Sequence, residues 1–190
     1  MVWLVLGLVL WSLAHAFPSL AAEQRSALIA RLGEGPYKGL FALVVVGAVA
    51  LMVIGWRATA PVALYVPPPG AGTSAVAGAL VLVAFLMFPA GRLKSNLRRA
   101  IRHPQLTAVA LWAVAHLIAN GEGRSVVLFG GLGLWALVEM VLINRRQGAW
   151  VRPEPVPLKA EVKPLGAGLV LFVVFLLLHP WLFGVSPFGG

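Results

Sequence analysis

Six long runs of apolar residues alternate with short polar segments along the 190 residues of this chain. The runs cover about residues 1–22, 39–56, 73–90, 104–119, 125–143 and 165–183. Each is close to the ~20 residues with which a helix crosses a bilayer. The pattern predicts an all-α polytopic membrane protein of about six transmembrane helices, with residues 1–190 forming a single integral membrane domain.

The segments between the runs predict little structure outside the membrane. Residues 19–32 are typical of a short amphipathic helix at the cytoplasmic surface, with Ser19 as N-cap and Gly33 just past its end. Residues 61–72 contain Pro67-Pro68-Pro69-Gly70 and predict an extended outer loop. Residues 151–164 carry four prolines, so we expect an irregular linker there. The first apolar run is followed by small residues but lacks a basic segment before it, which favours a retained span over a cleaved signal peptide.

Composition supports the membrane assignment, and charge placement predicts its orientation. The chain is 60% hydrophobic and only 11% charged, against roughly 25% charged residues in an average soluble domain. Thirteen of the 15 basic residues follow the first, third and fifth runs, and only Arg57 and Arg124 lie on the other side. The positive-inside rule then places both termini outside the cytoplasm. Contact with lipid headgroups explains the net charge of +9 without nucleic acid.

Two hexapeptides, residues 10–15 and 111–116, share the pattern Leu-Trp-x-x-Ala-His inside apolar runs. Residues 40–57 and 128–145 also show matches at one constant offset. These similarities suggest a 3+3 internal repeat, against the alternative that apolar sequences match by chance. An odd number of spans per half would invert one half relative to the other. His15 and His116 would then face each other across a pseudo-two-fold axis.

The histidines are the main candidates for chemistry. His15 and His116 each follow a tryptophan, Trp11 and Trp112, by four residues and therefore share a helix face with it. An imidazole in an apolar environment needs a partner, either a metal or a polar group on a neighbouring helix. Because the chain has no cysteine, thiolate ligands, iron–sulfur clusters and c-type haem are excluded. Imidazole ligands alone point to haem, copper or zinc, and two axial nitrogens satisfy haem, which here would be b-type.

Helix rise limits which histidines can share one iron. His103 begins the fourth run and lies ~20 Å along the helix axis from His116, so these two cannot form a pair. His15 and His116 differ in expected depth by about 10 Å, which strains that pair without excluding it. His179 lies at a depth similar to that of His116. His116/His179 is therefore the geometric alternative to His15/His116.

Two further polar positions are candidates for a catalytic role. His103 precedes Pro104 and follows Arg102, which is typical of a basic anchor at the start of a span. Glu139 is the one acidic residue well inside a run, where intramembrane charges usually pair with one another. The functional alternative is that Arg102, His103 and Glu139 cluster at the cytoplasmic mouth of a cofactor cavity and handle protons.

At these residues the chain resembles the NnrU family of bacterial membrane proteins, associated with denitrification, and its relative 15-cis-zeta-carotene isomerase. The matching features are His15, Arg102-His103-Pro104-Gln105, Trp112-x-x-Ala115-His116-Leu117, Asn120-Gly121 and Leu128-Phe129-Gly130. The resemblance implies a polytopic haem b protein in the bacterial inner membrane, with His15 and His116 as iron ligands. It also implies nitrogen oxides or a hydrophobic small molecule as partners. Whether the chain is an enzyme is left open.

The resemblance has one departure, and two other classes of protein compete with it. The isomerase has a cysteine three residues before its second ligand, where this chain has Ala113, so a thiolate switch is absent. The Arg-His-Pro motif also occurs in membrane methyltransferases, but Gln105 follows it here instead of tyrosine. A small transporter built on inverted repeats would usually have broken helices and midplane charges.

Overall fold

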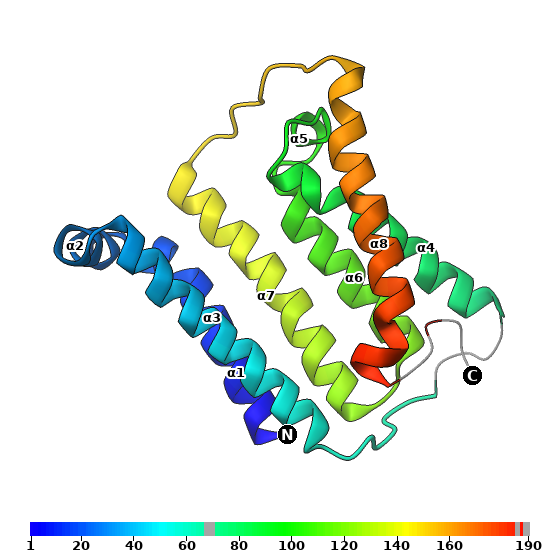
Figure 1. Ribbon diagram of the computed structural model, residues 1–190. Helices are drawn as coiled ribbons and strands as arrows, with labels where there is room; N and C mark the ends of the chain where they lie inside the picture. The colour runs from blue at the N-terminus through cyan, green and yellow to red at the C-terminus, as the bar shows by residue number, and fades with distance from the viewer. Residues whose placement is uncertain (67–70, 185–186, 188–190) are drawn as a thin grey trace.

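Every predicted apolar run forms a helix in the computed structural model, which describes residues 1–66, 71–184 and 187 (Figure 1). The helices are α1 (Val2–Leu20), α2 (Ala22–Leu32), α3 (Glu34–Arg57), α4 (Ala71–Met87), α5 (Leu97–Ala100), α6 (Pro104–Ala119), α7 (Gly123–Gln147) and α8 (Val162–Phe183), with 3-10 turns η1 (Pro89–Gly91) and η2 (Leu158–Glu161). Within the described residues, five helical segments are long and apolar enough to cross a membrane. The sixth apolar helix, α6, has 16 residues and spans about 24 Å.

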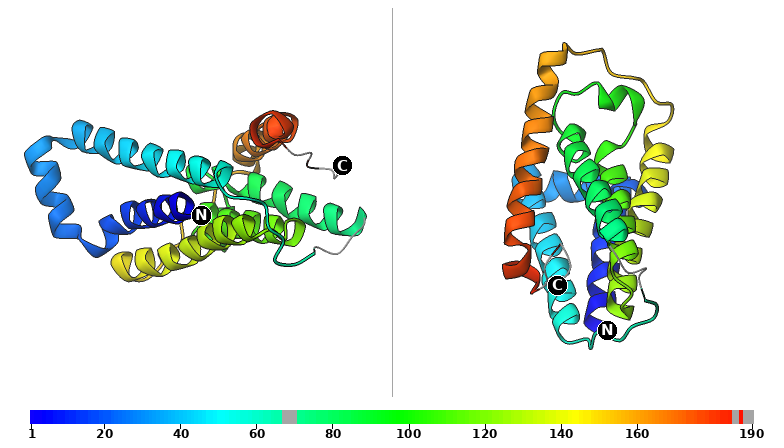
Figure 2. Two further views of the ribbon diagram at one scale, coloured as in Figure 1. Left: turned by 90° about the horizontal axis from the view of Figure 1, so that it is seen from below. Right: turned by 90° about the vertical axis from the view of Figure 1, so that its right-hand side faces the viewer.

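The spanning helices pack in the order α3, α1, α7, α6, α4 and α8, each against the next. Figures 1 and 2 show α1, α7, α6 and α4 as one layer, with α3 and α8 on the same side of it. The basic loops, which include α2, α5 and the linker before α8, lie at one end of the helices. The beginning of α1 lies at the opposite end, away from the basic loops, as the distribution of basic residues predicts.

Glycines allow two of these helix pairs to approach closely. Gly55 on α3 lies against the backbone of Leu4 on α1, with no room for a Cβ. Leu4, Leu8 and Met52 form a buried cluster beside this contact. Gly168 on α8 lies in the same way against the backbone of Phe85 and Leu86 on α4. Since lipid does not drive apolar helices together, such close packing is a main source of helix association in membranes.

A polar clamp holds the linker before α8 to the loop after α4. The Glu161 carboxylate accepts hydrogen bonds from the Ser95 hydroxyl, at 2.7 Å, and from the Asn96 backbone N–H, at 2.5 Å. The Asn96 side chain in turn donates to the Val156 carbonyl at 2.8 Å and accepts from the Val156 N–H at 2.9 Å. These bonds determine where the irregular chain re-enters the bundle.

A second set of bonds connects the outer loops beside the end of α6. Ala63 pairs with Glu122 in an isolated antiparallel bridge. The Tyr65 hydroxyl donates to the carbonyls of Leu117 and Asn120. The extended loop is confirmed as far as residue 66, and Pro67 to Gly70 lie outside the described residues. Ala71 and Gly72, which were also expected in the loop, begin α4 instead.

The predictions for Ser19 and Pro164 were wrong, and the prediction for Gly33 is confirmed. Ser19 does not cap α2, because α1 continues past Pro18, and the Ala21 N–H bonds to the Phe17 carbonyl at 2.9 Å. Gly33 does end α2, with a φ of 85°. The linker ends before Pro164, which lies in the first turn of α8, where its missing N–H removes no helical bond.

The packing also departs from the expected 3+3 repeat. In an inverted repeat, α1 would be structurally equivalent to α6, α3 to α7 and α4 to α8. The α1–α3 and α6–α7 contacts correspond to each other. The extensive contact of α4 with α6 should likewise have an equivalent between α8 and α1, but α8 has no comparable contact with α1 in the described part of the chain. Similar apolar hexapeptides therefore sit in different packing environments.

Candidate functional site

His15 lies five residues before the end of α1 in an aromatic environment. Its Nδ1 is 2.9 Å from the carbonyl oxygen of Trp11. Its ring centroid lies 4.3 Å from Trp11, 5.0 Å from Trp135 on α7 and 5.4 Å from Phe41 on α3. Three helices therefore fix the orientation of this imidazole.

His116 lies in the last turn of α6 and repeats the same local arrangement. Its Nδ1 is 2.8 Å from the carbonyl oxygen of Trp112, one turn earlier. Its ring lies 4.6 Å from Trp112 and stacks on Phe129 of α7 at 4.4 Å and 27°. Phe129 also contacts Trp56 of α3 edge to face. The predicted pairing of each histidine with its preceding tryptophan is confirmed as a contact.

These backbone hydrogen bonds determine the tautomer of both imidazoles. A carbonyl oxygen can only accept, so Nδ1 must carry the proton in each ring. In the neutral imidazole the lone pair is then on Nε2. Metal-bound histidines in proteins use this arrangement, because the Nδ1–H bond fixes the ring while Nε2 faces the metal. The tautomer of each imidazole therefore suits a metal or haem iron, with Nε2 as the donor atom.

Helix α7 separates the two imidazoles, as the sequence-based depths predict. Its residues Trp135 and Phe129, which contact His15 and His116 respectively, are six positions apart. This spacing corresponds to about 9 Å along α7, with the two side chains on different sides of the helix. His179 on α8 lies close enough to His116 to act on it electrostatically, and its own ring packs on Phe183. The structure thus brings His179 toward His116, and separates His15 from it.

His103 and Glu139 lie apart from each other instead of forming the expected cluster. The His103 Nε2 is 2.9 Å from Oδ1 of Asn144 on α7, and the Arg102 guanidinium donates to the Gly148 carbonyl at 2.9 Å. Both bonds fasten the start of α6 to the end of α7. Glu139 lies instead on the side of α7 that faces α1, five positions from Asn144. In the described part of the chain it forms no ion pair within 4 Å, although the charge of Arg146 acts on it over a longer range.

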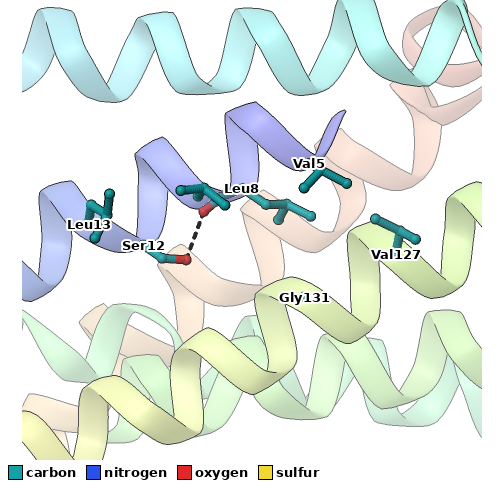
Figure 3. Close-up of a pocket in the computed structure, with 7 residues that line it drawn as sticks. Val5, Leu8, Ser12, Leu13, Val127 and Gly131 are labelled. Atoms are coloured by element: carbon teal, nitrogen blue, oxygen red, sulfur yellow. Dashed lines mark hydrogen bonds between the residues drawn. The ribbon is translucent and has the colours of Figure 1, made fainter. Parts of the chain in front are cut away.

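An apolar groove between α1 and α7 was not predicted from the sequence. Figure 3 shows its outer part, a space of about 330 Å³ that includes Leu8, Ser12, Val127 and Gly131 among its lining residues. The Ser12 hydroxyl is turned back to the Leu8 carbonyl at 2.7 Å, so it offers no free donor to the groove. The adjoining part, of about 360 Å³, reaches Glu139. No local motif marks this groove, because it depends on how two helices distant in sequence pack.

Within the residues that the structure describes, no group of three or more His, Asp or Glu side chains is placed to bind one metal ion. Haem requires only two axial protein ligands.

The helices define an all-α polytopic membrane protein, in which two histidines on different helices are each flanked by aromatic rings. The chain belongs to the NnrU protein family, whose model matches residues 3–187. No curated protein and no solved structure matches the chain.

Proposed function

We propose that the chain is an integral membrane haem b protein of the NnrU type, located in the bacterial inner membrane with both termini periplasmic. The observation that carries the proposal is the shared geometry of His15 and His116. Each ring donates its Nδ1–H to the carbonyl four residues earlier and so leaves the Nε2 lone pair for a ligand. The resemblance of the sequence to the NnrU family and its isomerase relative implies the same cofactor, and the family match covers residues 3–187.

The aromatic residues around each imidazole supply the surroundings that a flat macrocycle needs. Trp135 and Phe41 cover His15, and Phe129 and Trp112 cover His116. They exclude water and restrict ring rotation, so each histidine presents Nε2 in one direction. Bound haem would supply one-electron redox chemistry or binding of a small ligand.

His116 is common to both ligand pairs under consideration. The resemblance favours His15 as the second ligand, and the α1–α7 packing needs to shift to bring His15 closer. The position of His179 on α8, within electrostatic range of His116, favours the alternative pair. Both pairs use the same cofactor chemistry and differ in the helix that supplies the second ligand.

An absorption spectrum of the detergent-purified protein tests the proposal. A Soret band with reduced α and β bands at one haem per chain is expected, and a protein without haem absorption after expression with adequate haem supply contradicts it. His116→Ala should abolish the low-spin spectrum. His15→Ala should abolish it for the first pair and His179→Ala for the second. His103→Ala is the matched control, because His103 bonds Asn144 and should leave the spectrum unchanged.

A role in nitrogen-oxide metabolism is the second part of the proposal and rests on family membership. Deleting the gene should impair growth on nitrate without oxygen or cause nitrogen oxides to accumulate. Wild-type protein should restore the phenotype and His116→Ala should not. If wild-type protein and His116→Ala restore growth equally, the role in nitrogen-oxide metabolism does not depend on haem binding at His116. A membrane methyltransferase or a small transporter, the other readings of the sequence, would not give the haem spectrum.

A further inference from the structure

The groove between α1 and α7 continues along most of both helices. Its two parts share Ser12, Leu13 and Gly131 and extend from Val5 to Leu20 on α1. That separation corresponds to about 22 Å along the helix. Apart from the inward-bonded Ser12, the outer part is lined by aliphatic side chains and glycine. The shape fits one extended hydrocarbon chain.

The inner part of the groove is lined mainly by apolar atoms, with one carboxyl group in its wall. Glu139 lines it, is only 7% exposed, and its Oε2 has no hydrogen bond. Trp135 lines the same part, and its indole N–H is also buried without a partner. Because buried polar groups are nearly always hydrogen-bonded, the unpaired carboxyl oxygen of Glu139 and the unpaired N–H of Trp135 mark this end of the groove as the place for a polar ligand group.

We propose that this groove binds a quinol, a lipid with a hydroquinone head and a single prenyl chain. The head complements the end of the groove: a phenolic O–H donates to the Glu139 carboxyl, and a ring oxygen accepts from the Trp135 N–H. The chain occupies the apolar part toward Val5. An acyl chain of an ordinary phospholipid would fill the same space, but it carries no donor at the depth of Glu139. The charge of Arg146, two turns further along α7, reaches this carboxyl without bonding to it.

The position of Trp135 connects this groove with the histidine site. The same indole ring that lines the groove lies 5.0 Å from the His15 ring and 5.3 Å from Trp11. A quinol head at Glu139 would thus be separated from His15 by one aromatic side chain. The inference goes beyond the proposed function and does not need haem, since the groove and its polar end are formed by the chain itself.

Binding of decylubiquinol to the protein in lipid nanodiscs, measured without oxygen, tests the proposal. The comparison ligand is its dimethyl ether, which has the same chain and ring but no O–H. We expect the quinol to bind at least about tenfold more tightly than the ether. Equal affinities for the two ligands would overturn the proposal and leave a groove that holds hydrocarbon chains only. Because the assay detects binding, it can be run on haem-free and haem-loaded protein, and its failure is distinct from a failure of haem binding.

Variants in the groove locate the site. Glu139→Leu should bring the quinol-to-ether preference close to one, and an unchanged preference would contradict the assigned head position. Glu139→Gln keeps the shape of the side chain and a hydrogen-bond acceptor, so it should retain part of the quinol-to-ether preference. This variant tests the head position if Glu139→Leu does not fold. Leu134→Trp, in the groove wall, should weaken both ligands several-fold. Leu137→Trp is its control, because Leu137 is similarly exposed on α7 and does not line the groove.

Discussion

The imidazole of His116 stacks on the ring of Phe129, with the centroids 4.4 Å apart and 27° between the planes. Trp112 lies against both rings, at 4.6 Å and 5.0 Å. This three-ring cluster joins the last turn of α6 to α7 and fixes the direction of Nε2. A change in Phe129 should therefore affect how firmly His116 holds a ligand without removing the ligand atom.

Phe129→Leu is predicted to keep the haem spectrum but to speed haem loss. The leucine side chain no longer stacks on the His116 imidazole, so this ring can rotate more freely. Haem binding must then restrict that rotation, which costs entropy. Transfer of haem to apomyoglobin should become several-fold faster. Phe172→Leu, in the Phe85 cluster of α4 and α8, is the matched control and should transfer haem at the wild-type rate. Equal rates for the two variants would show that Phe129 has no role in retention.

The orientation predicted from the basic residues can be measured with reporters. A periplasmically active reporter fused after Gly190 should be active, and one inserted after Gln147 should be inactive. The reason is that thirteen basic residues lie in three loops at one end of the helices. A cytoplasmic carboxyl terminus would require an odd number of spans or removal of the first one.

The contact of Gly168 with α4 should be sensitive to a single methyl group. A Cβ at this position would overlap the backbone of Phe85 and Leu86, so Gly168→Ala should destabilise the α4–α8 pair by about 1–3 kcal/mol. Gly166→Ala, two residues earlier on the same helix, faces open space and should be neutral or stabilising by up to ~1 kcal/mol. Unfolding of both variants in mild detergent provides the comparison. A similar loss in both would mean that helix propensity or lipid contact, not close approach, governs this helix.

The carboxylate of Glu161 should protect the linker before α8. Glu161→Ala removes its bonds to Ser95 and Asn96 and leaves two donors unpaired, so limited proteolysis within residues 148–157 should become several-fold faster. Glu154→Ala removes an equal charge from an exposed position of the linker and should not change the rate. If both variants are cut alike, the clamp does not restrain the linker.

His103 is predicted to act as a fastening between α6 and α7. A double-mutant cycle of His103→Ala and Asn144→Ala should give a coupling energy of about 0.5–1.5 kcal/mol for their 2.9 Å contact. His103→Phe should leave haem content unchanged. If it nevertheless alters the pH dependence of the haem midpoint potential between pH 5.5 and 8.5, the proton-handling role expected from the motif gains direct support.

The sequence determined the spans and the local histidine geometry better than the site between helices. Apolar runs and helix periodicity are local, so the six helices and the contact of Trp112 with His116 were both predictable. The contacts of Trp135 and Phe129 with the imidazoles depend on which helices become neighbours, and no spacing in the sequence reports that. Glu139 and His103 have similar expected depths, but the rotation of α7 places Glu139 toward α1 and Asn144 toward α6. The depth of a side chain in the membrane follows from its residue number, whereas the neighbour toward which it points follows from helix packing.

The attachment of α8 has a consequence for how the protein is assembled in the cell. Among the spanning helices, α8 packs extensively on α4 alone, and the Glu161 clamp holds its beginning. The first five spans therefore contain all their mutual contacts before α8 leaves the ribosome. A gene split within codons 148–157, with a new start codon on the second fragment, should yield two polypeptides that reassemble in the membrane. The last span would then behave as a separable subunit, recruited through Gly168 and Glu161.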